Sequence, residues 1–189
     1  MRSKGALGLL LLIIIVGLAG CYGCASSNDF VEAEESVAQA WGDVENQYQR
    51  RADLVPRLVE SVEAAADLER DLVVAVKASR EAVLRLAAGS SSDPADIEAF
   101  MNAQDRFTSD LTKLTAAAGR RTELQSVEAY RDLLVQLEGT ENRIAVARRK
   151  YNASVSEYNG LVRRFPKSIF AGIFGFEPKP AFTSDRTSG

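Results

Sequence analysis

Apolar residues recur at steps of three and four over most of the chain, which is the pattern of amphipathic, coiled-coil-like helices. The most regular stripe lies in the last third of the sequence: Leu133, Leu137, Ile144, Ala147, Tyr151, Val155, Tyr158 and Val162. The body of the chain shows no sustained alternation of apolar and polar residues, as strands would require. The pattern therefore predicts an all-α protein, an antiparallel up-and-down four-helix bundle.

The first expected helix begins after a small polar tether, where Asn28 or Asp29 can accept hydrogen bonds from the first-turn amides. Its apolar seam is Val37, Trp41, Val44 and Tyr48. Pro56 decides where this helix ends, because a proline inside a helix removes a backbone hydrogen bond and costs about 3 kcal/mol. We expect a turn at 51–53, with Asp53 capping a second helix and Pro56 in its first turn. A single kinked helix through Pro56 is the alternative.

The second helix is expected to run to residue 87 or 88, and the loop at 89–94 is the clearest in the chain. Asp93 caps the third helix there and Pro94 takes its first position. The third helix, 94–119, carries a stripe that includes one polar residue: Ile97, Phe100, Gln104, Phe107, Leu111, Leu114 and Ala118. A gap at 119–125 separates it from a fourth helix over 127–164.

The N-terminal segment opens with two positive charges and continues as an uncharged apolar run from Gly5 to Gly20, which is typical of a targeting or anchoring element. The run ends Leu18-Ala19-Gly20-Cys21, like a bacterial lipobox, so it predicts a lipoprotein signal peptide with lipidation at Cys21. The alternative is an uncleaved membrane span, for which the run is slightly shorter than the roughly 20 residues required. Either anchor holds the domain outside the cytoplasm, because the positive charges stay inside.

The expected organisation is a signal peptide or anchor at 1–20, a tether at 21–28, the bundle at 29–164 and a tail at 165–189. The tail gathers large apolar residues between glycines and prolines: Phe165, Ile169, Phe170, Ile173, Phe174, Phe176 and Phe182. Such a cluster is expected to be buried against something. It either caps the end of the bundle or contacts lipid or a partner.

Composition excludes several kinds of chemistry. The chain has no His, which removes the commonest general base and the commonest zinc ligand. Cys21 and Cys24 form a C-x-x-C pair, but without the βαβ context of a redox site. Residues 1–20 carry two bases and no acid, so 21 bases and 26 acids remain, a net charge of −5. We therefore expect no enzyme activity, no cofactor, no metal and no nucleic-acid partner.

Charged residues near the expected turn and on the fourth helix invite a comparison with an active site. Acid pairs can hydrolyse glycosides, and Arg with Asn can bind phosphate. The residues concerned are Glu45, Arg50, Arg51 and Asp53 near the turn and Glu141, Arg148 and Asn152 on the fourth helix. Charges of this kind on amphipathic helices more often form a solvated or interhelical seam, such as an i, i+7 pair of Glu141 and Arg148. The candidate interaction or register residues are Arg50, Arg51, Glu141, Arg148, Arg149, Asn152 and Asn159.

Three blocks of the sequence resemble the LemA family of bacterial proteins. They are AWGDVENQYQRRADLVP at 40–56, LEGTENRIAVARRKYNASVSEYNGLVRRFP at 137–166, and the tail from 165 to 176. The resemblance implies a four-helix antiparallel domain behind an N-terminal membrane anchor in a bacterial envelope, with no established activity to carry over. The chain lacks the proline-containing segment that many relatives have before the last helix, so the turn near 127–131 is left open.

These observations favour a non-enzymatic, membrane-anchored protein of the cell envelope. It would act as a scaffold or adaptor, through protein–protein interaction with another envelope protein. The alternative is a bundle that binds a small molecule or a lipid with the aromatic tail as its lid. A third hypothesis, an envelope hydrolase, would require turnover that depends on Glu141 or Asp53.

Overall fold

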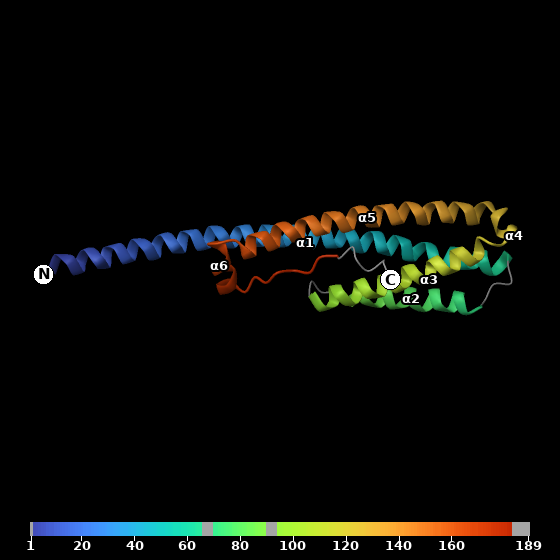
Figure 1. Ribbon diagram of the computed structural model, residues 1–189, viewed down its shortest axis with the longest axis horizontal. Coiled ribbons are helices and arrows are strands. Elements are labelled where there is room, and N and C mark those ends of the chain that lie inside the picture. The colour runs from blue at the N-terminus through green and yellow to red at the C-terminus, as the bar shows by residue number, and fades with distance from the viewer. Residues whose placement is uncertain (1, 66–69, 90–93, 183–189) are drawn as a thin grey trace. The chain divides into compact units, whose positions relative to one another are not determined.

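The computed structural model describes residues 2–65, 70–89 and 94–182, most of which are helical (Figure 1). In chain order the helices are α1 (Arg2–Ala65), α2 (Arg70–Gly89), α3 (Pro94–Ala118), α4 (Thr122–Gln125), α5 (Glu128–Arg163) and α6 (Lys167–Phe174). None of the described residues belongs to a strand. The all-α prediction is confirmed.

The chain divides into two compact units, each assembled from segments far apart in sequence. Unit 1 comprises Met1–Ala38 and Ala153–Lys179, and unit 2 comprises Gln39–Asn152 and Pro180–Gly189. Unit 1 therefore holds the beginning of α1, the end of α5, and α6. Unit 2 holds the remainder of α1 and α5 together with α2, α3 and α4.

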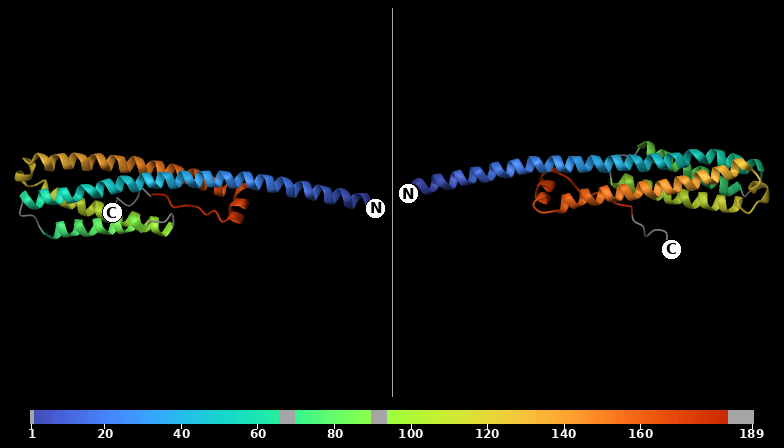
Figure 2. Two further views of the ribbon diagram at one scale, coloured as in Figure 1. Left: turned by 180° about the vertical axis from the view of Figure 1, so that it is seen from behind. Right: turned by 90° about the horizontal axis from the view of Figure 1, so that it is seen from above.

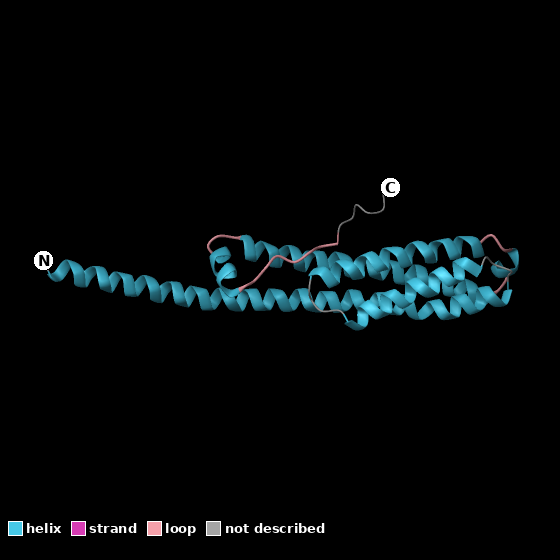
Figure 3. Cartoon of the chain, turned by 90° about the horizontal axis from the view of Figure 1, so that it is seen from below, coloured by secondary structure: helices cyan, strands magenta, loops and turns pink. Residues whose placement is uncertain are grey.

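Unit 2 is the predicted four-helix bundle, in which consecutive long helices run antiparallel (Figure 3). The predicted stripes form its core. The buried side chains from α1, α3 and α5 include Trp41, Val44, Tyr48, Val55, Leu58, Val62, Ile97, Phe100, Phe107, Leu111, Leu114, Ala118, Leu133, Leu137, Ile144, Ala147 and Tyr151. Val73, Val76 and Val83 of α2 complete it. Periodicity located the parts of this core from residues 41–48, 97–118 and 133–151, because residues three and four apart share one helix face.

The predicted turn at 51–53 is wrong, because α1 continues as a helix to Ala65. Pro56 lies inside this helix and has no N–H to give the carbonyl of Ala52. Arg80 of α2 donates its Nε–H to that carbonyl instead, at 2.7 Å. Asp53 is not a cap: it is exposed, and its Oδ1 accepts a hydrogen bond from Gln49 at 3.0 Å. The alternative of a helix continuing through Pro56 is the correct one.

Two other boundaries differ from expectation. Helix α1 already includes residues 21–28, so Asn28 and Asp29 do not cap its start. Asp29 instead forms an ion pair with Lys167, at 2.6 Å. The third and fourth predicted helices agree with α3 and α5 to within a residue. The expected cap Asp93 lies outside the described residues.

The turn that the sequence left open is built around α4, between α3 and α5. Leu124 of α4 is fully buried, which fixes this short helix to the bundle. The Gln125 side chain donates to the carbonyl of Gly119 at 2.7 Å, and the Val127 amide donates to Leu124 at 3.0 Å. These bonds satisfy backbone groups that a helix end leaves unpaired, so no proline is needed to stop α3.

In unit 1, α6 stands across the axis of α1 (Figure 1 and Figure 2). It ends at Gly175, whose φ of 79° lies in the left-handed region that glycine adopts without strain. Of the two roles expected for the tail's large apolar residues, a cap over the end of the bundle does not account for all of them, and a contact with lipid or a partner stays a prediction. Four are exposed, namely Phe165, Ile169, Ile173 and Phe174, while Phe182 is buried in unit 2.

The described residues contain no helical segment that meets the length and apolarity required to cross a membrane. The side chains of Cys21 and Cys24 lie outside the part of the chain that the structure describes. Lipidation at Cys21 and the signal peptide therefore stay predictions.

The Arg80 bond to the Ala52 carbonyl gives the first testable prediction. Replacing Arg80 with Met should lower the free energy of unfolding by about 1.5–3 kcal/mol, because a buried carbonyl loses a charged donor. In a Pro56→Ala background the same change should cost about 1 kcal/mol less, since residue 56 then supplies its own N–H. Denaturant unfolding of the four proteins in mild detergent measures this coupling.

Arg85→Met, on an exposed position of the same helix, is the matched control and should change stability by less than about 0.5 kcal/mol. Equal effects of Arg80→Met in both backgrounds would show that the Arg80 bond does not compensate for the proline.

Candidate functional site: a buried arginine and a clamped tail

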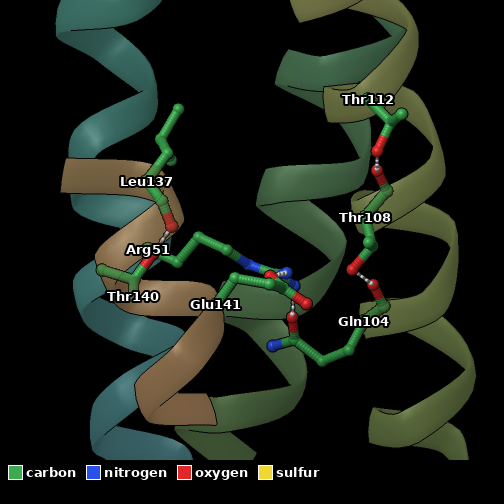
Figure 4. Close-up of polar contacts among 7 residues, drawn as sticks. All are labelled: Arg51, Gln104, Thr108, Thr112, Leu137, Thr140 and Glu141. Carbon is green, nitrogen blue, oxygen red and sulfur yellow. Dashed lines mark hydrogen bonds and ion pairs between the residues drawn. The ribbon is translucent and has the colours of Figure 1, made fainter. Parts of the chain in front are cut away.

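Unit 2 contains a polar centre where side chains from three helices meet (Figure 4). Arg51 of α1 is only 2% exposed although it carries a full charge. Its Nη1 donates to Oε2 of Glu141 on α5 at 2.9 Å, and its Nη2 donates to Oε1 of Gln104 on α3 at 3.0 Å. The centre therefore ties α1, α3 and α5 together at one level of the bundle.

Burying the Arg51 guanidinium is unfavourable unless its surroundings replace water. The rings of Tyr48 and Phe107 each lie 5.2 Å from the guanidinium carbon, which adds cation–π attraction to the two hydrogen bonds. The Glu141 side chain is 57% exposed, so only one member of the ion pair loses most of its hydration. Arg51 Nε and Gln104 Nε2 are nevertheless buried without a hydrogen-bond partner.

Threonines close to this centre bond within their own helices. Thr108 donates to the carbonyl of Gln104 at 2.8 Å, and Thr112 donates to that of Thr108 at 2.8 Å (Figure 4). The buried hydroxyl of Thr140 donates to Leu137 at 2.7 Å. These hydroxyl groups are satisfied locally and do not contribute to the bonds around Arg51.

Sequence reasoning listed Arg51 and Glu141 among the candidate register residues, but it considered Glu141 as an i, i+7 pair with Arg148 on the same helix. Glu141 pairs with Arg51, across the bundle. Gln104 was missed as a partner, although a signal was present. Arg51 and Gln104 are polar residues at seam positions of two helices, and buried polar groups generally need each other.

A second arrangement in unit 2 holds the tail. The Asn152 side chain donates to the carbonyl of Phe182 at 2.9 Å and accepts from its amide at 2.8 Å. The Tyr151 hydroxyl donates to the carbonyl of Pro180 at 2.9 Å. The Phe182 ring stacks on Trp41 at 6.1 Å and receives the Arg148 guanidinium on its face at 4.5 Å.

Burial controls the ionisation of the tyrosines in these clusters. It raises the pKa of Tyr151 to about 12, so this hydroxyl would remain a donor even at a pH near the ordinary tyrosine pKa of about 10. Burial also raises the pKa of Tyr48, although Arg148 and Arg51 both act to lower it.

In unit 1 a second asparagine side chain also bonds the amide and the carbonyl of one tail residue. The Asn159 side chain donates to the carbonyl of Lys179 at 2.9 Å and accepts from its amide at 2.8 Å. The Lys179 ammonium pairs with Glu34 at 2.8 Å and lies 5.4 Å from the centre of the Tyr158 ring. Asn152 and Asn159 were expected to set register between helices, and the structure places both on the tail backbone.

A shallow hollow of about 330 Å³ lies between α1 and α5 in unit 2. Its lining combines charged, amide and apolar side chains: Asp43, Gln47, Asn142, Arg143, Val146, Ala147 and Lys150. Val146 is 44% exposed there, and Oε1 of Gln47 is buried without a hydrogen-bond partner. The candidates Arg50 and Arg149 are exposed on the same two helices.

Among the described residues, no group of three or more Cys, Asp or Glu side chains is placed to hold a metal ion. The polar groups gathered in unit 2 instead form hydrogen bonds and cation–π contacts between helices and tail.

The model of the LemA family matches residues 40–188, which is most of the chain. The protein belongs to the LemA family. The match includes the helices that carry Arg51, Gln104 and Glu141, together with the tail.

This LemA-family chain is also similar to magnetosome proteins. It is 34% identical over 80 residues to Magnetosome protein MamQ 2 and to Magnetosome protein MamQ 1 of Paramagnetospirillum magneticum. It is 31% identical over 80 residues to Magnetosome protein MamQ of Magnetospirillum gryphiswaldense. Each match covers 42% of this chain and 29% of the relative's own length. Together with the family, these relatives point to a membrane-associated protein.

The arginine centre generates a prediction about stability. Replacing Gln104 with Leu should lower the free energy of unfolding by about 1–3 kcal/mol, because the buried guanidinium loses one of its two acceptors. Gln136→Leu, on an exposed position of α5, should be nearly neutral. Urea unfolding of both variants tests this. If Gln104→Leu is as stable as Gln136→Leu, the hydrogen bond from Arg51 to Gln104 does not stabilise the bundle.

The two hydrogen bonds between the Asn152 side chain and the backbone of Phe182 generate a separate prediction. Asn152→Asp keeps the acceptor but replaces the donor with a carboxylate oxygen facing the carbonyl of Phe182, so the tail should detach more often. Cleavage after Phe182 by a protease specific for aromatic residues should then be faster than in the parent protein. Asn46→Asp, at an exposed position of α1, should leave that rate unchanged. If the Asn152→Asp variant is cleaved as slowly as the parent protein, the Asn152 hydrogen bonds do not hold the tail in place.

Proposed function

We propose that this protein is a non-enzymatic scaffold or adaptor of the bacterial cell envelope, anchored in a membrane and acting through contact with another envelope protein. The observation that carries the proposal is the hollow between α1 and α5 in unit 2. It offers an exposed apolar side chain, Val146, inside a rim of charges and amides. Protein interfaces commonly combine an apolar centre with a polar rim.

The charges on the rim indicate the kind of partner that would fit the hollow. Arg143 and Lys150 on the rim favour a partner whose contacting surface is acidic around an apolar side chain.

The hollow serves recognition better than catalysis. Its lining residues include Asp43 as the single acid, and a glycosidase-like mechanism uses two carboxyl groups. The buried charge of Arg51 is already engaged by Glu141 and Gln104.

In-cell crosslinking of a C-terminally tagged full-length protein, followed by purification in mild detergent, tests the proposal. We expect one reproducible companion protein with the parent chain and at least about a fivefold loss of it with Arg143→Glu plus Lys150→Glu, since reversed rim charges repel an acidic surface. Arg106→Glu plus Arg131→Glu changes exposed arginines outside the hollow by the same net charge and should retain the companion.

Absence of any companion from the parent sample would refute the adaptor proposal. A companion retained by both variants would refute the hollow as its binding site.

Ligand binding beneath the tail is the second candidate function. Trp41 Nε1 is buried without a hydrogen-bond partner, directly beside the Phe182 ring. A small molecule or lipid that replaced Phe182 could accept a hydrogen bond there, with the tail as lid. Saturable thermal stabilisation by such a ligand would favour this candidate over the adaptor.

A further inference from the structure

The short helix α6 presents an apolar face to the outside of unit 1. Its eight residues include one charged side chain, Lys167. The exposed fractions of Phe165, Ile169, Ile173 and Phe174 are 77%, 54%, 69% and 47%. Ile169 and Ile173 are four residues apart within α6, so they share a side of this helix, and Phe165 precedes it. A face of this kind on so short a helix marks a surface that something else covers.

The position of α6 along α1 indicates the nature of that cover. A Cβ atom at Gly23 would come within 2.9 Å of the Phe170 ring, so α6 packs directly against α1 at that residue. The ion pair of Lys167 with Asp29 fixes its start, and the Phe176 ring lies 5.0 Å from the Phe30 ring. In sequence, Gly23 follows Cys21 by two residues and the end of the apolar run by three.

The direction of α6 fits a membrane surface. The helix stands across α1 in views from two perpendicular directions (Figure 2). If the beginning of α1 enters a bilayer along its own axis, α6 lies in the plane of the interface. Helices that bind membranes in this way insert their apolar face among the headgroups and the first acyl carbons.

The charges beside the apolar face fit an anionic surface. Arg163 and Arg164, which immediately precede Phe165, are both exposed. Long basic side chains at this depth reach lipid phosphates while their stems stay in apolar surroundings. Of the nearby acids, Glu177 is exposed, whereas Asp29 is paired with Lys167, which reduces its repulsion of an anionic surface.

We propose that α6 is an interfacial helix, and that Phe165, Ile169, Ile173 and Phe174 insert into the surface of the same anionic bilayer that holds the N-terminal anchor. This inference rests on the membrane anchoring in the proposed function. It holds for a lipidated Cys21 and for an uncleaved apolar run, because both place the bilayer next to Gly23.

The test uses the full-length Ile173→Trp variant in vesicles of phosphatidylethanolamine and phosphatidylglycerol. Native Trp41 is 6% exposed, so it is shielded from quenchers and its emission is subtracted using the parent protein. Lipids brominated near the headgroup should remove about half or more of the emission of the introduced indole, because that ring would lie among the first acyl carbons. Iodide in the water should quench it at least about fivefold less than the indole of a Val135→Trp variant, at an exposed position of α5.

Equal iodide quenching at both positions would overturn the proposal, because α6 would then lie in water. Protection from iodide without quenching by brominated lipid would also overturn it. In that case a protein would cover the helix, either a partner or a second copy of this chain. A parent chain that does not float with the vesicles would instead refute the proposed anchoring, and this flotation control separates the two failures.

Discussion

A single hydrogen bond between helices, from Arg80 to the carbonyl of Ala52, allows α1 to pass through Pro56 without a break. A proline inside a helix leaves the carbonyl one turn earlier without its usual donor, at a cost of about 3 kcal/mol. Here a side chain from the neighbouring helix replaces that donor. Because α1 stays helical, its apolar positions Val55, Leu58 and Val62 keep the same face and join the core of unit 2.

The uninterrupted helix also fixes the position of Arg51 along the bundle. One turn away from Pro56, its guanidinium meets Gln104 and Glu141 from two other helices. Fully buried charges rarely add net stability, but they penalise every arrangement in which their partners are missing. Arg51 therefore favours one axial register of α1, α3 and α5, as a polar residue in a coiled-coil seam does.

The tail is held mainly through its backbone. Asn152 and Asn159 each bind both the amide and the carbonyl of one tail residue, which is recognition that is independent of the tail's side chains. Phe182 and Lys179 then add specific contacts, the first with aromatic rings and the second with Glu34. Lys179 is thereby held within unit 1 and Phe182 within unit 2, while α6 keeps an apolar face exposed.

The sequence by itself determined the helical class, the bounds of α3 and α5 and the apolar stripes of the first, third and last helices, because three-four periodicity reports which side of a helix avoids water. It also marked Arg51 as a candidate register residue and, through its resemblance to the LemA family, indicated the family. Only the tertiary structure decided that α1 passes Pro56, that Glu141 pairs with Arg51, and that the two asparagines bind the tail. Each of these depends on a partner group that is distant in sequence: a hydrogen-bond donor for the Ala52 carbonyl, an opposite charge for Glu141, and tail backbone groups for the two asparagines. Local propensities carry no information about such partners.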